Sequence, residues 1–195
     1  MYLYSGQGLF TTSMGQTTSK PTEEISTHFD KKEIQNFHDL FDRNTNSSKK
    51  ITKQDLNVLY MKYFPFGDPS AFVDLIFGLF KNGNDQNPID FNEFICAWSI
   101  VSRGNLDERI IWSFKFHDVD KDSVISKEDL KIVIKACSQI NRGLIDSSDV
   151  DIDKKISQIL DLFNVTESIS FDSFSVTIRT DPSLLRGFLL FDGLI

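Results

Sequence analysis

The sequence is poor in the residues that define several large classes of protein. It has 2 cysteines in 195 residues, Cys96 and Cys137, which form no C-x-x-C pair and are too few for a disulfide framework. Its 3 histidines stand in no H-E-x-x-H or other catalytic spacing, and no glycine-rich phosphate loop is present, so the sequence predicts no enzyme. No apolar run approaches the roughly 18 residues of a membrane-spanning helix.

Basic residues are also in the minority. The chain has 21 Lys and Arg against 28 Asp and Glu, a formal net charge of -7. This balance argues against a nucleic-acid partner, because proteins that bind nucleic acid concentrate basic residues to neutralise phosphates. It favours a protein that binds cations. Phenylalanine, by contrast, is abundant at 18 residues, which indicates more apolar surface than a core needs and suggests a protein partner.

A fourfold internal repeat organises the chain. In each copy an Ile precedes a helix-capping residue, which is followed three positions later by an acidic or polar residue and then by a large apolar one. Apolar residues at helical spacing lie on both sides of each copy, so the repeating unit is helix-loop-helix. The sequence therefore predicts an all-α fold of four such units in two paired lobes, with short β pairings between loops at the Ile positions. The four copies are Ile51-Thr52…Asp55-Leu56, Ile89-Asp90…Glu93-Phe94, Ile125-Ser126…Asp129-Leu130 and Ile169-Ser170…Ser173-Phe174.

The third loop, DVDKDSVISKED, has the ligand pattern of an EF-hand. Such a loop supplies side-chain oxygens at positions 1, 3, 5 and 9, a backbone carbonyl at 7 and an acid at 12, because calcium takes six to eight oxygen ligands. If the terminal acid binds through one oxygen, because it is Asp and not Glu, six ligands remain, which is nearer to the preference of magnesium. We predict Ca²⁺, with Mg²⁺ as an alternative, on Asp118, Asp120, Asp122, Val124, Ser126 and Asp129.

Ser123 stands in this loop where glycine normally takes the left-handed turn, which costs a residue with a Cβ atom about 1–2 kcal/mol. We therefore expect a reduced affinity for the cation.

The second loop keeps a correct terminal acid but has neutral amides at its first ligand positions. Its entering helix also ends one residue too far from Ile89. Fewer charged ligands lower the affinity for calcium, so a weak second site is predicted at most. Its ligands would be Asn82, Asn84, Gln86, Pro88, Asp90 and Glu93.

The first and fourth loops are predicted to be structural. In the first, Lys49 replaces the turn glycine and Lys50 adds repulsion. In the fourth, Phe163 ends the entering helix too late, which leaves a loop about two residues short, and Ser173 replaces the final acid.

Three regions are expected along the chain. Residues 1–26 form a flexible N-terminal segment, 27–100 the N-terminal EF-hand pair, and 101–195 the C-terminal pair with a C-terminal helix. The polar, acidic stretch 141–155 is interpreted as a linker between the third and fourth units. The apolar segment 184–195 could cover a groove when no target is bound.

These residues resemble the neuronal calcium sensor family of recoverin- and frequenin-like EF-hand proteins, with the frequenin-like members most similar. The resemblance rests on FPFGDP at 64–69, on the SRG-x-LDE string at 102–108 followed by Trp112, and on the C-terminal ending from Asp181-Pro182 to Ile195. It implies an inactive first hand and calcium at the other three, whereas the second and fourth loops here have damaged ligand sets.

The resemblance also implies N-myristoylation. Met14-Gly15 begins an M-G-x-x-x-S/T pattern, and Gly15 could be acylated only if translation starts at Met14. The expected localisation is cytoplasmic, with peripheral membrane attachment if the chain is acylated.

The leading hypothesis is a calcium-responsive regulator that binds a helix of a target protein in a hydrophobic groove. The resemblance implies a lipid kinase, a receptor tail or a channel as the target. The alternative is a calcium-independent adaptor or auxiliary subunit with the same fold. Groove candidates, each of which could equally be a core residue, are Tyr60, Tyr63, Phe72, Phe77, Phe94 and Trp98.

Overall fold

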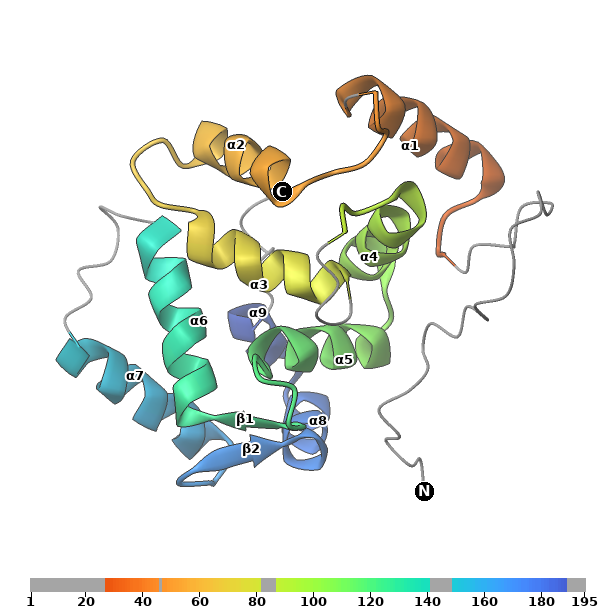
Figure 1. The fold of residues 1–195 in the computed structure, drawn as a ribbon. Helices are drawn as coiled ribbons and strands as arrows, with labels where there is room; N and C mark the ends of the chain where they lie inside the picture. Colours follow the sequence, from red (N-terminus) through yellow and green to blue (C-terminus); the bar gives the residue numbers. More distant parts are fainter. Residues whose placement is uncertain (1–26, 46, 82–86, 141–148, 189–195) are drawn as a thin grey trace.

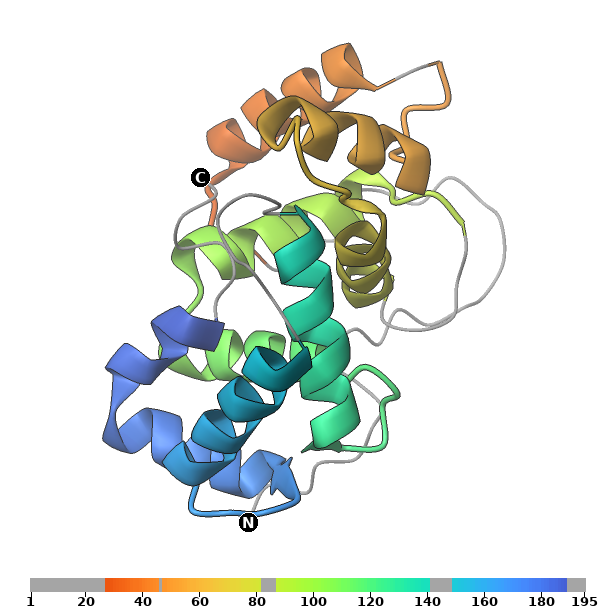
Figure 2. The same ribbon diagram turned by 90° about the vertical axis from the view of Figure 1, so that its left-hand side faces the viewer.

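The computed structural model describes residues 27–45, 47–81, 87–140 and 149–188. Within them the chain is mainly helical, as predicted (Figure 1). The N-terminal helices lie at one end of the molecule and the C-terminal helices at the other (Figure 2). The elements are α1 (Lys31–Asn44), α2 (Lys53–Tyr63), α3 (Ser70–Phe80), α4 (Phe91–Arg103), α5 (Leu106–His117), β1 (Val124–Ser126), α6 (Lys127–Ile140), α7 (Asp149–Leu162), β2 (Ser168–Ser170), α8 (Phe171–Thr180), the 3₁₀ helix η1 (Pro182–Leu184) and α9 (Leu185–Phe188).

The four isoleucines of the repeat pair with one another across the loops. Strands β1 and β2 are antiparallel and place Ile125 opposite Ile169. In the N-terminal half, the backbone N–H of Ile51 donates to the carbonyl of Ile89 at 2.9 Å, and the reverse bond is 2.8 Å. The predicted β pairings are therefore confirmed, and they join the hands as first with second and third with fourth.

Capping residues fix where several helices begin. In a capping box, the side chain of the residue before the helix accepts from the backbone N–H three residues later, while the acid at that position accepts from the first residue. This reciprocal pattern satisfies N–H groups that have no partner inside the helix. It occurs at Asp30 with Glu33, Thr52 with Asp55, Asp90 with Glu93, and Asn105 with Glu108.

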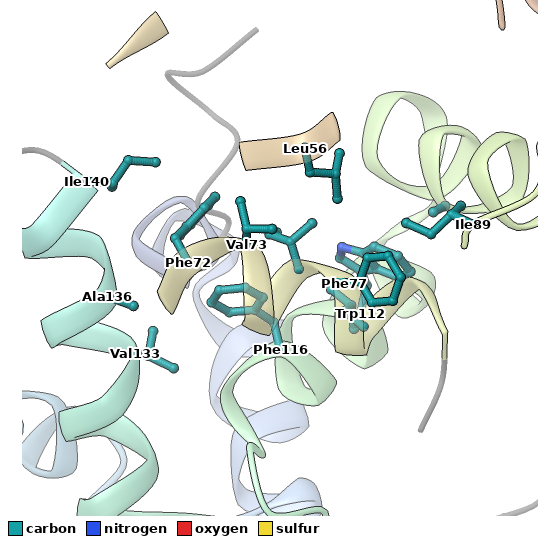
Figure 3. Packing of buried hydrophobic residues seen from close by; sticks show 13 residues of the cluster. Leu56, Phe72, Val73, Phe77, Ile89, Trp112, Phe116, Val133, Ala136 and Ile140 are labelled. Atoms are coloured by element: carbon teal, nitrogen blue, oxygen red, sulfur yellow. The ribbon is translucent and has the colours of Figure 1, made fainter. Parts of the chain in front are cut away.

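A hydrophobic core in the N-terminal half extends into α5 and α6 (Figure 3). Phe72 and Val73 of α3 belong to the same cluster as Trp112 of α5 and Val133 of α6. The predicted boundary near residue 100 falls inside α4, which runs from Phe91 to Arg103. The division into two lobes stays a prediction, and the described cores show that third-hand helices help to bury α3.

The contact between α3 and α6 continues into the turn before α3. The N–H of Asp68 donates to the carbonyl of Gln139 at 2.9 Å. A Cβ on Gly67 would lie 1.9 Å from the carbonyl oxygen of Ile140, so only glycine allows this approach of backbone to backbone. The C-terminal end of α6 is thereby held against the α2–α3 turn.

A second core fills the C-terminal half. It joins α5, α7, α8 and the short α9, where Phe188 is 7% exposed and packs on the rings of Phe163 and Phe174. The buried Ser113 hydroxyl donates to the carbonyl of Phe188 at 3.1 Å. The described part of the apolar C-terminal segment therefore packs within the C-terminal half, and residues 189–195 lie outside the described residues.

The prediction of a linker over 141–155 is wrong for its second part. Helix α7 begins at Asp149, so the acidic residues at its start belong to a helix. Ile152 and Ile156 are 2% and 5% exposed and lie one helical turn apart in the C-terminal core. Asp149, Asp151 and Asp153 give the start of this helix the acidic composition of a linker. Residues 1–26, including Gly15, lie outside the described part of the chain.

Candidate metal centre

The third loop brings three carboxylates together. Asp118 directly follows α5, and its backbone N–H donates to the carbonyl of Phe114 at 2.9 Å. One carboxylate oxygen from each of Asp118, Asp120 and Asp122 lies within 4.8 Å of the others. Two oxygens that share a calcium ion, each at about 2.4 Å, are at most about 4.8 Å apart. The three side chains therefore fit a single calcium coordination sphere.

The Asp118 carboxylate is buried with one oxygen unsatisfied. The residue is 5% exposed, its Oδ2 accepts from the N–H of Ser123 at 3.2 Å, and its Oδ1 has no hydrogen-bond partner in the structure. Burial raises the pKa of Asp118, and the nearby carboxylates of Asp122, Asp129 and Asp120 raise it further. A buried charged oxygen with no partner is costly, so this position is suited to a cation.

Asp129, at the terminal acid position, closes the loop. It is 2% exposed, and its Oδ1 accepts from the N–H of Val119 at 3.1 Å. Its Oδ2 accepts from the N–H of Ser126 at 2.8 Å and from the Ser126 hydroxyl at 2.6 Å. Asp129 thus ties the start of the loop to the start of α6. In the described geometry its carboxylate is engaged by loop donors and is outside the three-aspartate cluster.

The remaining loop residues set the backbone. The carboxylate of Asp120 accepts from the N–H of Asp122 at 3.2 Å, and that of Asp122 accepts from the N–H of Val124 at 2.9 Å. Lys121 and Ser123 have φ of 64° and 74°, the left-handed region that favours glycine. Ser123 therefore adopts the turn that its position demands, at the expected conformational cost.

His117 adjoins this cluster and was not recognised as part of its surroundings from the sequence. Burial lowers its pKa to about 4, so the ring is neutral near pH 7. Its Nδ1 lies 2.8 Å from the carbonyl oxygen of Ser113, which can only accept, so Nδ1 carries the proton. The ring also packs edge-on against Phe188. A neutral His117 therefore brings no positive charge to the start of the third loop.

The second loop is arranged differently around its terminal acid. The Lys81 ammonium lies 2.6 Å from Oε1 of Glu93, and Oε2 of Glu93 accepts from the N–H of Asp90 at 2.9 Å. Pro88, another predicted ligand, is half-buried. The other three predicted ligands, at positions 82, 84 and 86, lie outside the described residues. The weak second site stays a prediction, but both oxygens of Glu93 already have donors.

The first and fourth loops use their polar groups for internal contacts. Lys49 adopts φ 51° and forms an ion pair with Asp42 of α1. The hydroxyl of Ser170 accepts from the N–H of Ser173, which caps α8. Among the residues the structure describes, only the third loop gathers three acidic, histidine or cysteine side chains that could share a metal ion.

The predicted groove residues divide between core and surface. Phe72 and Phe77 are 1% and 2% exposed and lie in the N-terminal core, so neither offers surface in this conformation (Figure 3). Tyr60 packs edge-on against Phe72, Phe94 and Trp98 are half-buried, and Tyr63 is 72% exposed.

Sequence analysis did not single out other apolar side chains around α2. Val58, Leu59, Met61 and Phe66 are exposed on α2 and the turn after it. Their spacing along α2 does not indicate which of them are exposed, because both faces of the helix carry apolar residues.

The chain is similar in sequence to known proteins over most of its length. No family model matches the chain, and no helix among the described residues meets the length and hydropathy needed to cross a bilayer. The chain is 28% identical over 190 residues to neuronal calcium sensor 1 of Lymnaea stagnalis, covering 92% of this chain and 98% of that protein. It is 29% identical over 190 residues to neuronal calcium sensor 1 of Aplysia californica, with the same coverage. Frequenin is another name for neuronal calcium sensor 1, so the resemblance seen in the sequence is confirmed, and the similarity to the neuronal calcium sensor family extends over nearly the whole length of the chain.

Proposed function

We propose that this chain is a calcium-binding regulatory protein in which the third EF-hand is the working site. The observation that carries the proposal is the Asp118 carboxylate, which is buried, has an unpartnered oxygen and faces the carboxylates of Asp120 and Asp122. Its relatives carry the name of calcium sensors, which supports the same role.

Calcium would be held by the three aspartates together with the Val124 carbonyl, Ser126 and Asp129. A bound calcium ion would neutralise carboxylates that are partly buried and repel one another. Ser126 and Asp129 are already hydrogen-bonded to each other, at 2.6 Å between Oγ and Oδ2, so they must exchange this contact for the ion. Magnesium is the alternative occupant, because it requires fewer protein ligands than calcium does.

The regulatory part of the proposal is the binding of a target helix by apolar surface. The exposed apolar side chains around α2, including Tyr63 at 72% and Phe66 at 86%, supply such a surface without any opening of the core. Phe72 and Phe77 would contribute only if α3 moved. A helix of a kinase, receptor tail or channel is the class of target that we expect.

A second candidate is a calcium-independent adaptor with the same fold. Two ion pairs favour the adaptor, because they place a cationic side chain in each N-terminal hand. Lys81 pairs with Glu93, and Lys49 pairs with Asp42. This candidate keeps the exposed α2 surface but does not couple it to calcium. Acylation of Gly15 and attachment to a membrane stay predictions in both cases, as does the absence of enzymatic activity.

Calorimetric titration of calcium into chelator-treated protein tests the metal site. We expect one site in the wild type, no site in Asp118→Ala, and weaker apparent calcium affinity in millimolar magnesium. Asp161→Ala, which removes an exposed carboxylate on α7, is the matched control and should bind as the wild type does. No heat in the wild type at calcium levels reached in cells would overturn the sensor proposal and favour the adaptor.

Binding of a designed amphipathic helical peptide tests the surface. We expect Tyr63→Ser to weaken binding, whereas Val176→Ser, on α8 and 64% exposed, should not. A sensor binds the peptide more tightly in calcium than in chelator. Equal affinity in the two conditions supports the adaptor, and no effect of Tyr63→Ser argues against the α2 surface.

A further inference from the structure

The second hand contains a buried lysine at the place where its entering helix ends. Lys81 directly follows α3, and its side chain is 4% exposed. Transfer of an ammonium group out of water is unfavourable unless it is paired and hydrogen-bonded. The carboxylate that pairs with it is Glu93 in the first turn of α4, at 2.6 Å and 29% exposed. This distance is that of a short, charge-assisted hydrogen bond.

Glu93 occupies the terminal acid position of its loop. In an EF-hand this acid binds the ion with both oxygens and links the exiting helix to the loop. Here one oxygen accepts from the N–H of Asp90 at 2.9 Å and the other from Lys81. The ammonium group therefore joins the end of α3 to the start of α4 across the loop, which is the connection that a bound calcium would make.

We propose that the Lys81 ammonium group is the built-in cation of the second hand. It balances the charge of Glu93 from within the chain and fixes the relative position of α3 and α4 in the absence of calcium. A calcium ion at Glu93 would have to displace this ammonium group from its carboxylate partner. The second hand is thus a permanently closed structural unit that supports Ile89 in its bridge to Ile51.

The third hand provides the contrast within the same molecule. Its buried Asp118 carboxylate has an oxygen with no partner in the structure, and no lysine fills that position. The terminal acid of the third hand, Asp129, accepts only from neutral donors, the N–H groups of Val119 and Ser126 and the Ser126 hydroxyl, whereas Glu93 of the second hand is paired with an ammonium group. This inference concerns a separate site and does not depend on calcium at the third loop.

Thermal unfolding in chelator tests the proposal through a double-mutant cycle. Lys81→Met keeps the apolar stem and removes the charge, and Glu93→Gln keeps the shape of its partner. Since breaking a buried pair strands the remaining charge, we expect each to lower Tm by about 5–10 °C in a chain of this size. The double variant should lose at least about 3 °C less than the sum of the two, because neither charge is stranded.

The matched control is Lys53→Met, which breaks the exposed pair with Asp74, where the side chains are 37% and 64% exposed. It should change Tm by no more than about 2 °C. Equal effects of Lys81→Met and Lys53→Met, or strictly additive losses in the cycle, would overturn the proposal. Lys81→Met could fail to fold. In that case, a double variant that does fold still supports the pairing. The proposal is contradicted if Lys81→Met and the double variant both fail to fold while Glu93→Gln is as stable as the wild type.

Calcium titration of Asp118→Ala supplies a second test, with the third hand removed. We expect no bound calcium in this variant. A residual site that is lost on adding Glu93→Gln would show that calcium displaces Lys81, and the proposal would be wrong. If the wild type binds no calcium at all, the proposed sensor function is wrong. The test of Lys81 still holds in that case, because it measures unfolding in chelator.

Discussion

Replacement of Asp118 by Asn should stabilise the protein in chelator and destabilise it, relative to the wild type, in calcium. The substitution keeps the shape of the side chain and an oxygen that can accept from Ser123, but it removes a buried negative charge. One oxygen of Asp118 lies within 4.8 Å of an oxygen of Asp120 and of Asp122. Two unit charges at that distance repel by about 0.9 kcal/mol in water and about 3.5 kcal/mol at an effective dielectric constant of about 20.

The expected gain lies toward the lower value, because Asp120 and Asp122 are exposed while Asp118 is 5% exposed. Two such pairs give about 2 kcal/mol, which raises Tm by about 4–8 °C. In calcium at 1,000 times Kd the wild type gains about 4.1 kcal/mol from binding. The variant has lost a ligand and gains little, so the order of stability reverses.

Thermal unfolding followed by circular dichroism in chelator and in calcium measures both effects. Asp161→Asn, at an exposed position on α7, controls for the loss of one negative charge and should shift Tm by less than about 2 °C in either condition. A variant that is less stable than the wild type in chelator would refute the claim that the three carboxylates repel one another. A variant that keeps the full calcium-induced rise in Tm would refute the role of Asp118 as a ligand.

Three further outcomes follow from the structure. Ser123→Gly should raise the free energy of unfolding by about 0.5–1 kcal/mol, because it relieves a φ of 74° but adds freedom to the unfolded chain, and no change in urea unfolding would contradict this. Gly67→Ala should lower it by about 1–3 kcal/mol, since its Cβ would meet the Ile140 carbonyl oxygen at 1.9 Å, and a neutral effect in the same assay would show that the contact can relax. Burial raises the pKa of Tyr60 to about 12 against about 10 when unfolded, so stability should fall by about 2.7 kcal/mol as pH rises through that window. Tyr60→Phe should remove that part of the loss, and alkaline unfolding curves that coincide for the two proteins would argue against it.

Local features of the chain were predictable because their physics is local. The helix caps depend on residues three positions apart, and each repeat contains a capping residue directly after its Ile, while the recurrence of that Ile marks the positions that pair between loops. The three aspartates of the third loop lie two residues apart, so their convergence follows from the loop that they form. The start of α7 was missed because an acidic composition was given more weight than the spacing of Ile152 and Ile156.

Features that depend on packing between distant elements could not be predicted. The sequence shows Lys81 as a charge after an apolar helix, and only the fold reveals that its side chain is buried beside Glu93. Likewise, Phe72 and Phe77 have the spacing of either a groove or a core. The packing of α3 against α5 and α6 decides for the core in this conformation. Nothing in the order of residues specifies that a helix of the third hand covers a helix of the second.

Helix α6 links the third loop to the turn between α2 and α3. Its first turn carries Asp129, which closes the third loop, and its last residue, Ile140, touches Gly67 in the turn between α2 and α3. Its 14 residues span about 21 Å, so a change of about 10° in direction at the loop displaces the far end by about 4 Å. The turn at that far end leads directly to the exposed apolar residues of α2. If calcium binds the third loop as proposed, α6 would connect that site to the exposed apolar surface around α2.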